Sequence, residues 1–150
     1  MSQVRIEVVT HDWSRFGEVL DLYYDVLYGP FGVARDAEWY HPAHGSDFAI
    51  ALGDAGELLG SARLLPAAGD DARQVRQVVV RPAAQGAGIG RELMCEIERI
   101  ASEQGARELW LHARCSAYGF YQSLGWTFVG DEFTSELTGV IHRTMRKVIR

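Results

Sequence analysis

The stretch from Gln77 to Leu93 constrains the fold of this chain more than any other. Three valines at 78–80 lead into a loop with glycine at positions 86, 88 and 90, and an amphipathic segment typical of a helix follows at once. Glycine allows the backbone to come close to a ligand, and the first turn of a helix carries free N–H groups at the positive end of its dipole. The stretch therefore predicts a strand, a loop and a helix that together bind a phosphate group.

Two well-known phosphate-binding loops do not fit these residues. A P-loop requires a lysine and then a serine or threonine after its last glycine, whereas an Arg-Glu pair follows the last glycine here. The dinucleotide-binding fingerprint requires glycine at its first, third and sixth positions. The sixth position holds Arg91 when counted from Gly86 and Leu93 when counted from Gly88, so both frames fail.

A third kind of loop does fit. Residues 85–90, Gln-Gly-Ala-Gly-Ile-Gly, resemble Gln/Arg-x-x-Gly-x-Gly/Ala, the pyrophosphate-binding loop of the GNAT acetyltransferase superfamily. Residues 117–126, Ala-Tyr-Gly-Phe-Tyr-Gln-Ser-Leu-Gly-Trp, resemble the second signature of that superfamily, a short helix of the form A-x-x-F-Y-x-x-L-G-F. The two motifs occur in the family's order. The resemblance covers residues 74–130, and the first half of the chain matches only in its pattern of elements.

Hydrophobic periodicity predicts the other elements. We expect strands at residues 5–9, 47–52, 58–65, 74–80, 108–113, 127–129 and 140–148. A first helix, capped by Asp12, runs to the Gly29-Pro30 pair, a second follows Gly88, and a short third ends at Gly125. Residues 31–46 fit either a further short helix or an irregular loop.

Together these elements predict one α/β domain over residues 1–150. The strand, helix and strand around the glycine loop should form a right-handed crossover with parallel strands. The result is a central mixed sheet of about six to seven strands, antiparallel in its first half and flanked by about four helices. The GNAT resemblance implies the same fold. At 150 residues, of which 47% are hydrophobic, the chain is long enough to bury one core.

Composition narrows the classes of partner. The formal net charge of −5 argues against nucleic acid or an anionic membrane as the main partner, and no apolar run approaches the length of a membrane span. The N-terminus lacks an apolar signal core, and two cysteines cannot form a disulfide framework, which favours a reducing cytoplasm. His41 and His44 have too few partners for a zinc site, so we expect no metal.

The resemblance implies that acetyl-CoA is the cosubstrate and an amine the acceptor. In this family the pyrophosphate rests on backbone N–H groups of the glycine loop, which here comprises Gln85, Gly86, Ala87, Gly88, Ile89, Gly90 and Arg91. The pantetheine arm pairs with the exposed edge of the preceding strand at Val78 and Val80, and an N–H near Val79 or Val80 polarises the thioester carbonyl. Without a ligand, the same residues would be a buried strand and a glycine-rich turn.

Tyr121, in the second motif, is the candidate catalytic residue. When an amine attacks the thioester, the leaving thiolate has a conjugate acid of pKa about 8.5, and a phenol of reference pKa about 10 can return a proton to it. The tyrosine of this motif has that role in many GNAT enzymes, so the resemblance implies that Tyr121 is the general acid. Packing beside Phe120 and Trp126 is the structural alternative, and Tyr118 is a weaker substitute.

The general base is not evident. Relatives often carry a glutamate on the strand before the glycine loop, where this chain has Arg76. A water relay, an acceptor of lower pKa, or a group from elsewhere in the chain are the alternatives. The candidate groups are Asp47, Asp70, Asp71, Glu132 and His112. A second departure is Arg114, where relatives often have an asparagine that holds the pantetheine arm; it could reach the phosphates, bind a carboxylate on the acceptor, or be solvated.

The sequence therefore predicts an N-acetyltransferase that moves the acetyl group of acetyl-CoA to a primary amine in a ternary complex. An acyl-CoA-binding sensor or accessory domain with little transfer activity is the alternative, because the usual glutamate is missing. The acceptor stays open between a small amine, an amino acid, an antibiotic and a protein amine. Trp39 and Tyr40 lie in the segment that walls the acceptor pocket in this family. Many relatives pair through strand edges, so a homodimer is also considered.

Overall fold

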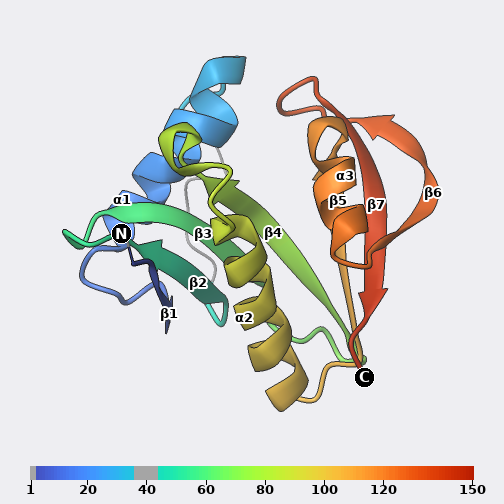
Figure 1. The fold of residues 1–150 in the computed structure, drawn as a ribbon. Coiled ribbons are helices and arrows are strands. Elements are labelled where there is room, and N and C mark those ends of the chain that lie inside the picture. The colour runs from blue at the N-terminus through green and yellow to red at the C-terminus, as the bar shows by residue number, and fades with distance from the viewer. Residues whose placement is uncertain (1–2, 36–43) are drawn as a thin grey trace.

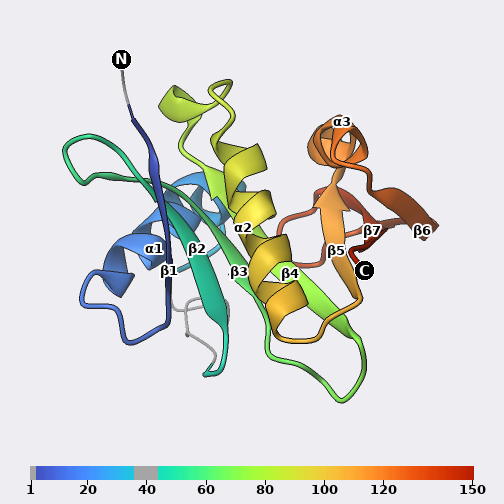
Figure 2. The same ribbon diagram turned by 60° about the horizontal axis from the view of Figure 1, so that its bottom comes forward.

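The computed structural model describes residues 3–35 and 44–150 and contains a seven-stranded sheet in the order β1-β2-β3-β4-β5-β7-β6 (Figure 1, Figure 2). The strands are β1 (Arg5–Val9), β2 (Asp47–Leu52), β3 (Leu58–Leu64), β4 (Ala72–Val80), β5 (Glu108–Arg114), β6 (Thr127–Thr134) and β7 (Ile141–Val148). Neighbouring strands are antiparallel except β4 and β5, which are parallel. This sheet confirms the mixed α/β architecture expected from the sequence.

Three α-helices lie among the described residues, against about four expected. They are α1 (Phe16–Leu22), α2 (Ile89–Glu103) and α3 (Tyr118–Ser123). The chain continues from α1 into a π-helical segment, Tyr23–Tyr28, and a 3-10 turn, Gly29–Phe31. Two further 3-10 turns, Pro82–Ala84 and Cys115–Ala117, precede α2 and α3.

The start of the first helix differs from the prediction that Asp12 caps it. The N-cap residue is Arg15, and no side chain hydrogen-bonds to the free N–H groups of the first turn. The backbone N–H of Trp13 instead bonds to the carbonyl oxygen of Thr10 at 3.0 Å. The chain is therefore still in a turn at Asp12, and the helix begins only at Phe16.

Apolar cores cover both faces of the sheet. Helix α2 packs on one face, where the periodic residues Leu93 and Ile97 are completely buried. Helix α1 and the π-helical segment pack on the other face, where Leu22 lies in one cluster with Phe48 and Ile50. Figure 2 shows α1 and α2 on opposite sides of the sheet. The two helices therefore hold the strands between them and fix the position of β4.

The sheet is split between β4 and β5. Their pairing joins Ala72–Gln74 to Glu108–Trp110 and goes no further. Beyond this point the two strands diverge, so that β5, β7, β6 and α3 form a second body beside the first (Figure 1). Strand β4 stays paired with β3 as far as Val80, which lies opposite Gly60. The edge of β4 that faces β5 is therefore unpaired along most of its length.

A β-bulge lies in β4 inside this wedge. Val79 is opposite Ser61, but Arg76 is opposite Arg63, so Gln77 and Val78 together face a single residue of β3. Gln77 has a φ of +53°, the one positive φ of a non-glycine residue in the described chain. A bulge of this kind bends the strand and re-aims its side chains.

Two predictions concern residues that the structure does not describe. Trp39 and Tyr40 lie outside the described residues, as does half of the segment 31–46 expected to be a short helix or a loop. Among the described helices, none is long and apolar enough to cross a membrane.

Candidate active site

The glycine loop between β4 and α2 presents backbone N–H groups to open space. Gly86 and Gly88 have φ values of +86° and +83°, and a Cβ on either would meet no protein atom within 4 Å. The first helical hydrogen bond runs from the N–H of Glu92 to the carbonyl of Gly88 at 3.1 Å. Within the described chain, the N–H groups of residues 86–91 form no hydrogen bond. The loop thus fits an anionic phosphate group, because free donors and the positive end of the α2 dipole coincide there.

One hydrogen bond and one close approach of the backbone position the loop. The side-chain amide nitrogen of Gln85 donates a hydrogen bond of 3.0 Å to the carbonyl oxygen of Val80. On the other side, a Cβ on Gly90 would lie 3.1 Å from Cζ of Phe120. Glycine at position 90 therefore lets the start of α2 approach α3 closely.

A cavity of about 570 Å³, which we call the loop cavity, opens beside this loop. It lies between the end of β4, the start of α2 and helix α3. All predicted cofactor-binding residues except Ala87 line it, namely Val78, Val79, Val80, Gln85, Gly86, Gly88, Ile89, Gly90 and Arg91. Phe120 and Tyr121 of α3 form the opposite wall.

The free edge of β4 faces the wedge with alternate backbone groups. The N–H of Arg81 bonds to the carbonyl oxygen of Leu59 at 2.8 Å, so this residue points its N–H toward β3. Since successive residues of a strand point their N–H and C=O groups in opposite directions, Val80 and Val78 direct theirs toward the wedge. This edge can pair with an extended molecule that carries amides.

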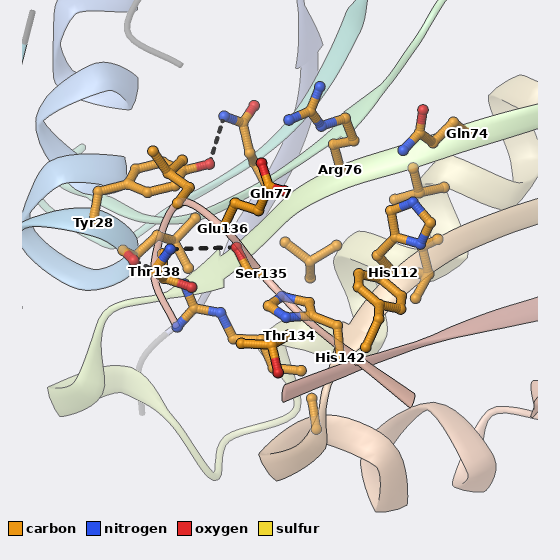
Figure 3. Close-up of a pocket in the computed structure, with 18 of the residues that line it drawn as sticks. Tyr28, Gln74, Arg76, Gln77, His112, Thr134, Ser135, Glu136, Thr138 and His142 are labelled. Atoms are coloured by element: carbon orange, nitrogen blue, oxygen red, sulfur yellow. Dashed lines mark hydrogen bonds between the residues drawn. The ribbon is translucent and has the colours of Figure 1, made fainter. Parts of the chain in front are cut away.

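A second cavity of about 600 Å³, the wedge cavity, lies where β4 and β5 diverge (Figure 3). Its walls come from five parts of the chain: the π-helical segment, β4, β5, the start of α3 and the β6–β7 hairpin. In contrast to the loop cavity, its lining is rich in polar side chains. Figure 3 shows Arg76 and Gln77 on β4, with His112 and His142 on the other side.

Tyr121 lies between the two cavities and lines both, together with Val78 and Ala117. Its ring packs edge-on against Phe120 and Trp126, with centroids 5.0 Å and 5.7 Å away. The residue is 6% exposed, and no hydrogen bond of its hydroxyl to another described residue contributes to its electrostatics. Burial raises the pKa of Tyr121, an effect that the nearby Arg114 guanidinium partly offsets. Tyr121 is therefore a protonated phenol at neutral pH, with its donor free.

Tyr118 has a different position, although it is in the same helix. Its hydroxyl donates a hydrogen bond of 2.9 Å to Glu132, and its ring packs against Phe128. It lines neither cavity. Tyr118 therefore cannot replace Tyr121 in this arrangement.

Of the five candidate bases, only His112 lines the wedge cavity. The other four are occupied in contacts that lie outside both cavities. Asp47 accepts from Gln104, Asp70 from the N–H of Ala72, Asp71 pairs with Arg107, and Glu132 accepts from Tyr118.

The environment of His112 favours the neutral imidazole. Its Nδ1 lies 3.0 Å from the hydroxyl oxygen of Thr144, and its ring packs edge-on against Phe133. Burial lowers the pKa of His112, and the neighbouring His142 and Arg76 lower it further. A neutral imidazole can accept a proton at physiological pH.

The two arginines that depart from the family pattern both line the wedge cavity. Arg76, in place of the usual glutamate, is exposed and forms no ion pair within the described chain. Arg114 donates a hydrogen bond of 2.8 Å to the carbonyl of Leu27 and lies over the ring of Phe31. It therefore bridges the two halves of the split sheet rather than reaching the glycine loop.

Sequence reasoning missed several residues of the wedge cavity. His142 and Glu136 are brought there by the β6–β7 hairpin, and Gln77 and Tyr28 by the bulge and the π-helical segment. The side-chain nitrogen of Gln77 donates to the Tyr28 hydroxyl at 3.1 Å. No sequence signal marks a bulge at a glutamine or a π-helix, so these residues had no motif. In the described residues, no group of three or more His, Cys, Asp or Glu side chains could hold a metal ion.

Comparison with known proteins adds a family to this geometry. The family model described as "Acetyltransferase (GNAT) domain" matches residues 31–149. This chain belongs to the GNAT acetyltransferase family. It is 33% identical over 84 residues to streptothricin acetyltransferase of Streptomyces lavendulae, a match that covers 54% of this chain and 44% of that protein. The chain thus spans less than half the length of the curated relatives it matches.

Solved structures share the complete fold of this GNAT chain. An acyl-CoA N-acyltransferase from Pseudomonas aeruginosa has a TM-score of 0.81 at 21% identity, over 97% of this chain and all of that one (100%). An aminoglycoside 6'-N-acetyltransferase complexed with coenzyme A has a TM-score of 0.80 at 17% identity, over 97% of each chain. These similarities confirm the GNAT fold that the two sequence motifs predicted.

Proposed function

We propose that this GNAT protein is an N-acetyltransferase that moves the acetyl group of acetyl-CoA to an amine. One observation carries the proposal: Tyr121 and Val78 are shared by two cavities, one beside a phosphate-binding loop and the other lined by polar side chains. Acetyl-CoA in the loop cavity and an amine in the wedge cavity would meet at these residues. Family membership and the name of the matched relative, streptothricin acetyltransferase, support the same reaction class.

The loop cavity would hold acetyl-CoA. The free N–H groups of residues 86–91 bind the pyrophosphate, and Arg91 adds a positive charge at the rim. The backbone groups of Val78 and Val80 pair with the amides of the pantetheine arm. An N–H near Val79 or Val80 stabilises the negative charge that develops on the thioester carbonyl oxygen. When bound, acetyl-CoA supplies an activated acetyl group.

Tyr121 would act as the general acid. The acceptor nitrogen forms a bond to the acetyl carbon while the carbon–sulfur bond breaks, and Tyr121 donates its proton to the departing thiolate. Its raised pKa keeps the proton on the phenol until that charge appears. Both substrates are bound before the reaction, so no covalent intermediate with the protein is needed.

His112 would accept the proton that the amine loses, directly or through a water molecule. An amine with a lysine-like pKa of about 10.4 needs about 4.6 kcal/mol for deprotonation at neutral pH, so a neighbouring base is useful. His112 qualifies because it lines the cavity and its pKa lies below the usual range. Thr144 would fix the orientation of the ring through Nδ1.

Two measurements test the proposal against the alternative of an acyl-CoA sensor. Calorimetry with CoA and acetyl-CoA should show binding, and a thiol-release assay with a panel of amines should show turnover. Tight CoA binding without turnover on any amine would favour the sensor. No heat with millimolar CoA would exclude both functions.

Pairing of two chains through the end of the sheet is also part of the proposal. The edge strand β6 and its neighbour β7 carry exposed large apolar side chains, including Val129, Ile141 and Val148. Such side chains support a homodimer through this edge. Sedimentation of the purified protein at a mass of two chains would agree with it, and a single-chain mass at micromolar concentration would rule it out.

A further inference from the structure

The charges of the wedge cavity oppose those of the whole protein. The chain has a formal net charge of −5. The charged and titratable side chains that line the cavity are two arginines, two histidines and one glutamate: Arg76, Arg114, His112, His142 and Glu136. A cleft lined mainly by one sign of charge focuses its field on the molecule inside it.

The arginine and histidine side chains gather on one face of the split sheet. On β5, Leu109, Leu111 and Ala113 are buried in the core beneath α2. Since side chains alternate along a strand, His112 and Arg114 point to the opposite face. Arg114 meets Leu27 and Phe31 on that side.

A third guanidinium lies directly beneath this face. Arg63 is 6% exposed, and it faces Arg76 in the antiparallel register of β3 and β4. It donates to the Ser46 hydroxyl oxygen at 3.0 Å and to Oε1 of Gln77 at 3.2 Å, both uncharged groups. Like charges directly opposite each other destabilise a strand pair.

None of these three arginines forms an ion pair with a carboxylate in the part of the chain that the structure describes. Burial lowers the pKa of Arg63 and of Arg114, because the charged guanidinium loses solvation. Arg76 is exposed and lines the wedge cavity, so its guanidinium is accessible to a bound molecule.

We infer that the acceptor is a small amine that also carries a carboxylate, and that Arg76 binds this carboxylate. The inference rests on the proposed function, because it places the acceptor in the wedge cavity. A guanidinium presents a planar pair of N–H donors that matches a carboxylate.

The spacing along β4 agrees with such an acceptor. Arg76 precedes Val78 by two residues, so the two lie no further apart along the backbone than the roughly 6–7 Å of a regular strand, and the bulge at Gln77 shortens this span. An amine at Val78 and Tyr121 is thus within a few bonds of a carboxylate at Arg76. Amino acids and the termini of short peptides have this arrangement, whereas a polyamine would place a second cation against the arginines.

The test compares amines that differ only in the carboxylate. L-Phenylalanine and L-leucine are measured against phenylalaninamide and leucinamide by thiol release with acetyl-CoA. The amides are a strict control, because loss of the adjacent carboxylate lowers the pKa of the amine and leaves more of it unprotonated. We expect kcat/KM to be higher for the carboxylates by about tenfold to a hundredfold, the range of a charge-assisted hydrogen bond.

Arg76→Gln should reduce this preference to about one, and Arg76→Lys should keep part of it, because lysine retains the charge but not the paired donors. Arg107→Gln is the matched control. Arg107 is exposed, pairs with Asp71 and lines neither cavity, so the same change of charge there should leave the preference intact. Circular dichroism of each variant verifies folding.

A binding measurement decides the matter if none of these amines reacts. Calorimetry of the CoA-loaded protein with N-acetylphenylalanine and with its amide should show the same preference and the same loss in Arg76→Gln. Equal or better use of the amides, a preference for spermidine, or binding of neither acetylated compound would overturn the inference. Turnover of amines without a carboxylate preference would leave the proposed transferase function standing, whereas failure to bind CoA would remove that function first.

Discussion

The loop cavity and the wedge cavity have similar volumes, about 570 and 600 Å³, but the chain builds them in different ways. The loop cavity comes from one contiguous stretch and α3, and its donors are backbone N–H groups. The wedge cavity comes from five separate parts of the chain, and its polar groups are side chains. A site built from backbone N–H groups suits a ligand that all members of a family share. A site built from side chains can change its ligand when those residues are replaced.

Tyr121 belongs to both cavities, and its replacement should have the largest effect. Tyr121→Phe removes the proton donor while the ring packing is kept. We expect kcat to fall by about a hundredfold or more, since general acid catalysis contributes that much, with CoA affinity nearly unchanged. Steady-state kinetics and calorimetry measure the two quantities. A kcat close to that of the wild type would show that the thiolate leaves without help from Tyr121.

The pH dependence of kcat tests whether Tyr121 stays protonated during catalysis. Because its pKa is raised, the phenol stays protonated through and beyond the range in which an ordinary tyrosine ionises. We therefore expect no loss of kcat from Tyr121 ionisation below about pH 10. An alkaline decline centred near pH 8 that disappears in Tyr121→Phe would contradict this.

A matched pair of glycine variants tests whether the loop cavity depends on its backbone. Gly88→Ala and Gly69→Ala both place a Cβ on a residue with positive φ, +83° and +93°, where no protein atom is within 4 Å. Both should lower the free energy of unfolding by about 1–2 kcal/mol. Only Gly88→Ala should weaken CoA binding, by about tenfold, because its Cβ stands in front of the free N–H groups. Equal CoA affinity in the two variants would mean that the phosphates bind elsewhere.

His112→Gln tests the side-chain character of the wedge cavity. We expect a fall in kcat of about tenfold at pH 7, since a water relay can replace part of the base. In the wild type, kcat should rise as pH increases through the pKa of His112, which lies below the usual histidine value, and the variant should lack this rise. A pH profile that is unchanged in His112→Gln would exclude the imidazole as the base.

Stability provides an independent check on the same residue. Since the pKa of His112 is lower in the folded protein than in the unfolded chain, the unfolded chain binds more protons in the interval between the two values. The free energy of unfolding should therefore decrease as pH falls through that interval, just below the usual histidine pKa. Urea titrations of wild type and His112→Gln at several pH values would show a smaller decrease in the variant.

The smallest effect is expected for Tyr118→Phe. This change removes a hydrogen bond to Glu132 outside both cavities, in the same helix as Tyr121. We expect kcat to stay within about twofold of the wild type, as for most surface substitutions. A loss as large as that of Tyr121→Phe would mean that the two tyrosines exchange roles when substrates bind.

The difference between the cavities also explains what the sequence could predict. The loop cavity follows from local rules: glycines at 86, 88 and 90, a strand before them and an amphipathic helix after them. Tyr121 was found because it lies in a contiguous motif. The wedge cavity depends on a bulge at Gln77, a π-helical turn that places Tyr28, and a hairpin that returns His142 to the site. These positions are set by tertiary packing, so no single stretch of the chain carries their signal.

The unpaired inner edge of β4 has a consequence for how the protein behaves in solution. Exposed strand edges invite other sheets to add to them, which leads to aggregation. Here the edge lines the two cavities, and β5 and α3 stand beside it (Figure 1). A foreign sheet would have to bring its neighbouring strands and side chains between β4 and β5, whereas a slender linear molecule needs only the space of the cavities. The position of this edge therefore favours a thin, extended ligand over a strand of another protein. The backbone groups of β4 stay available for binding without promoting aggregation.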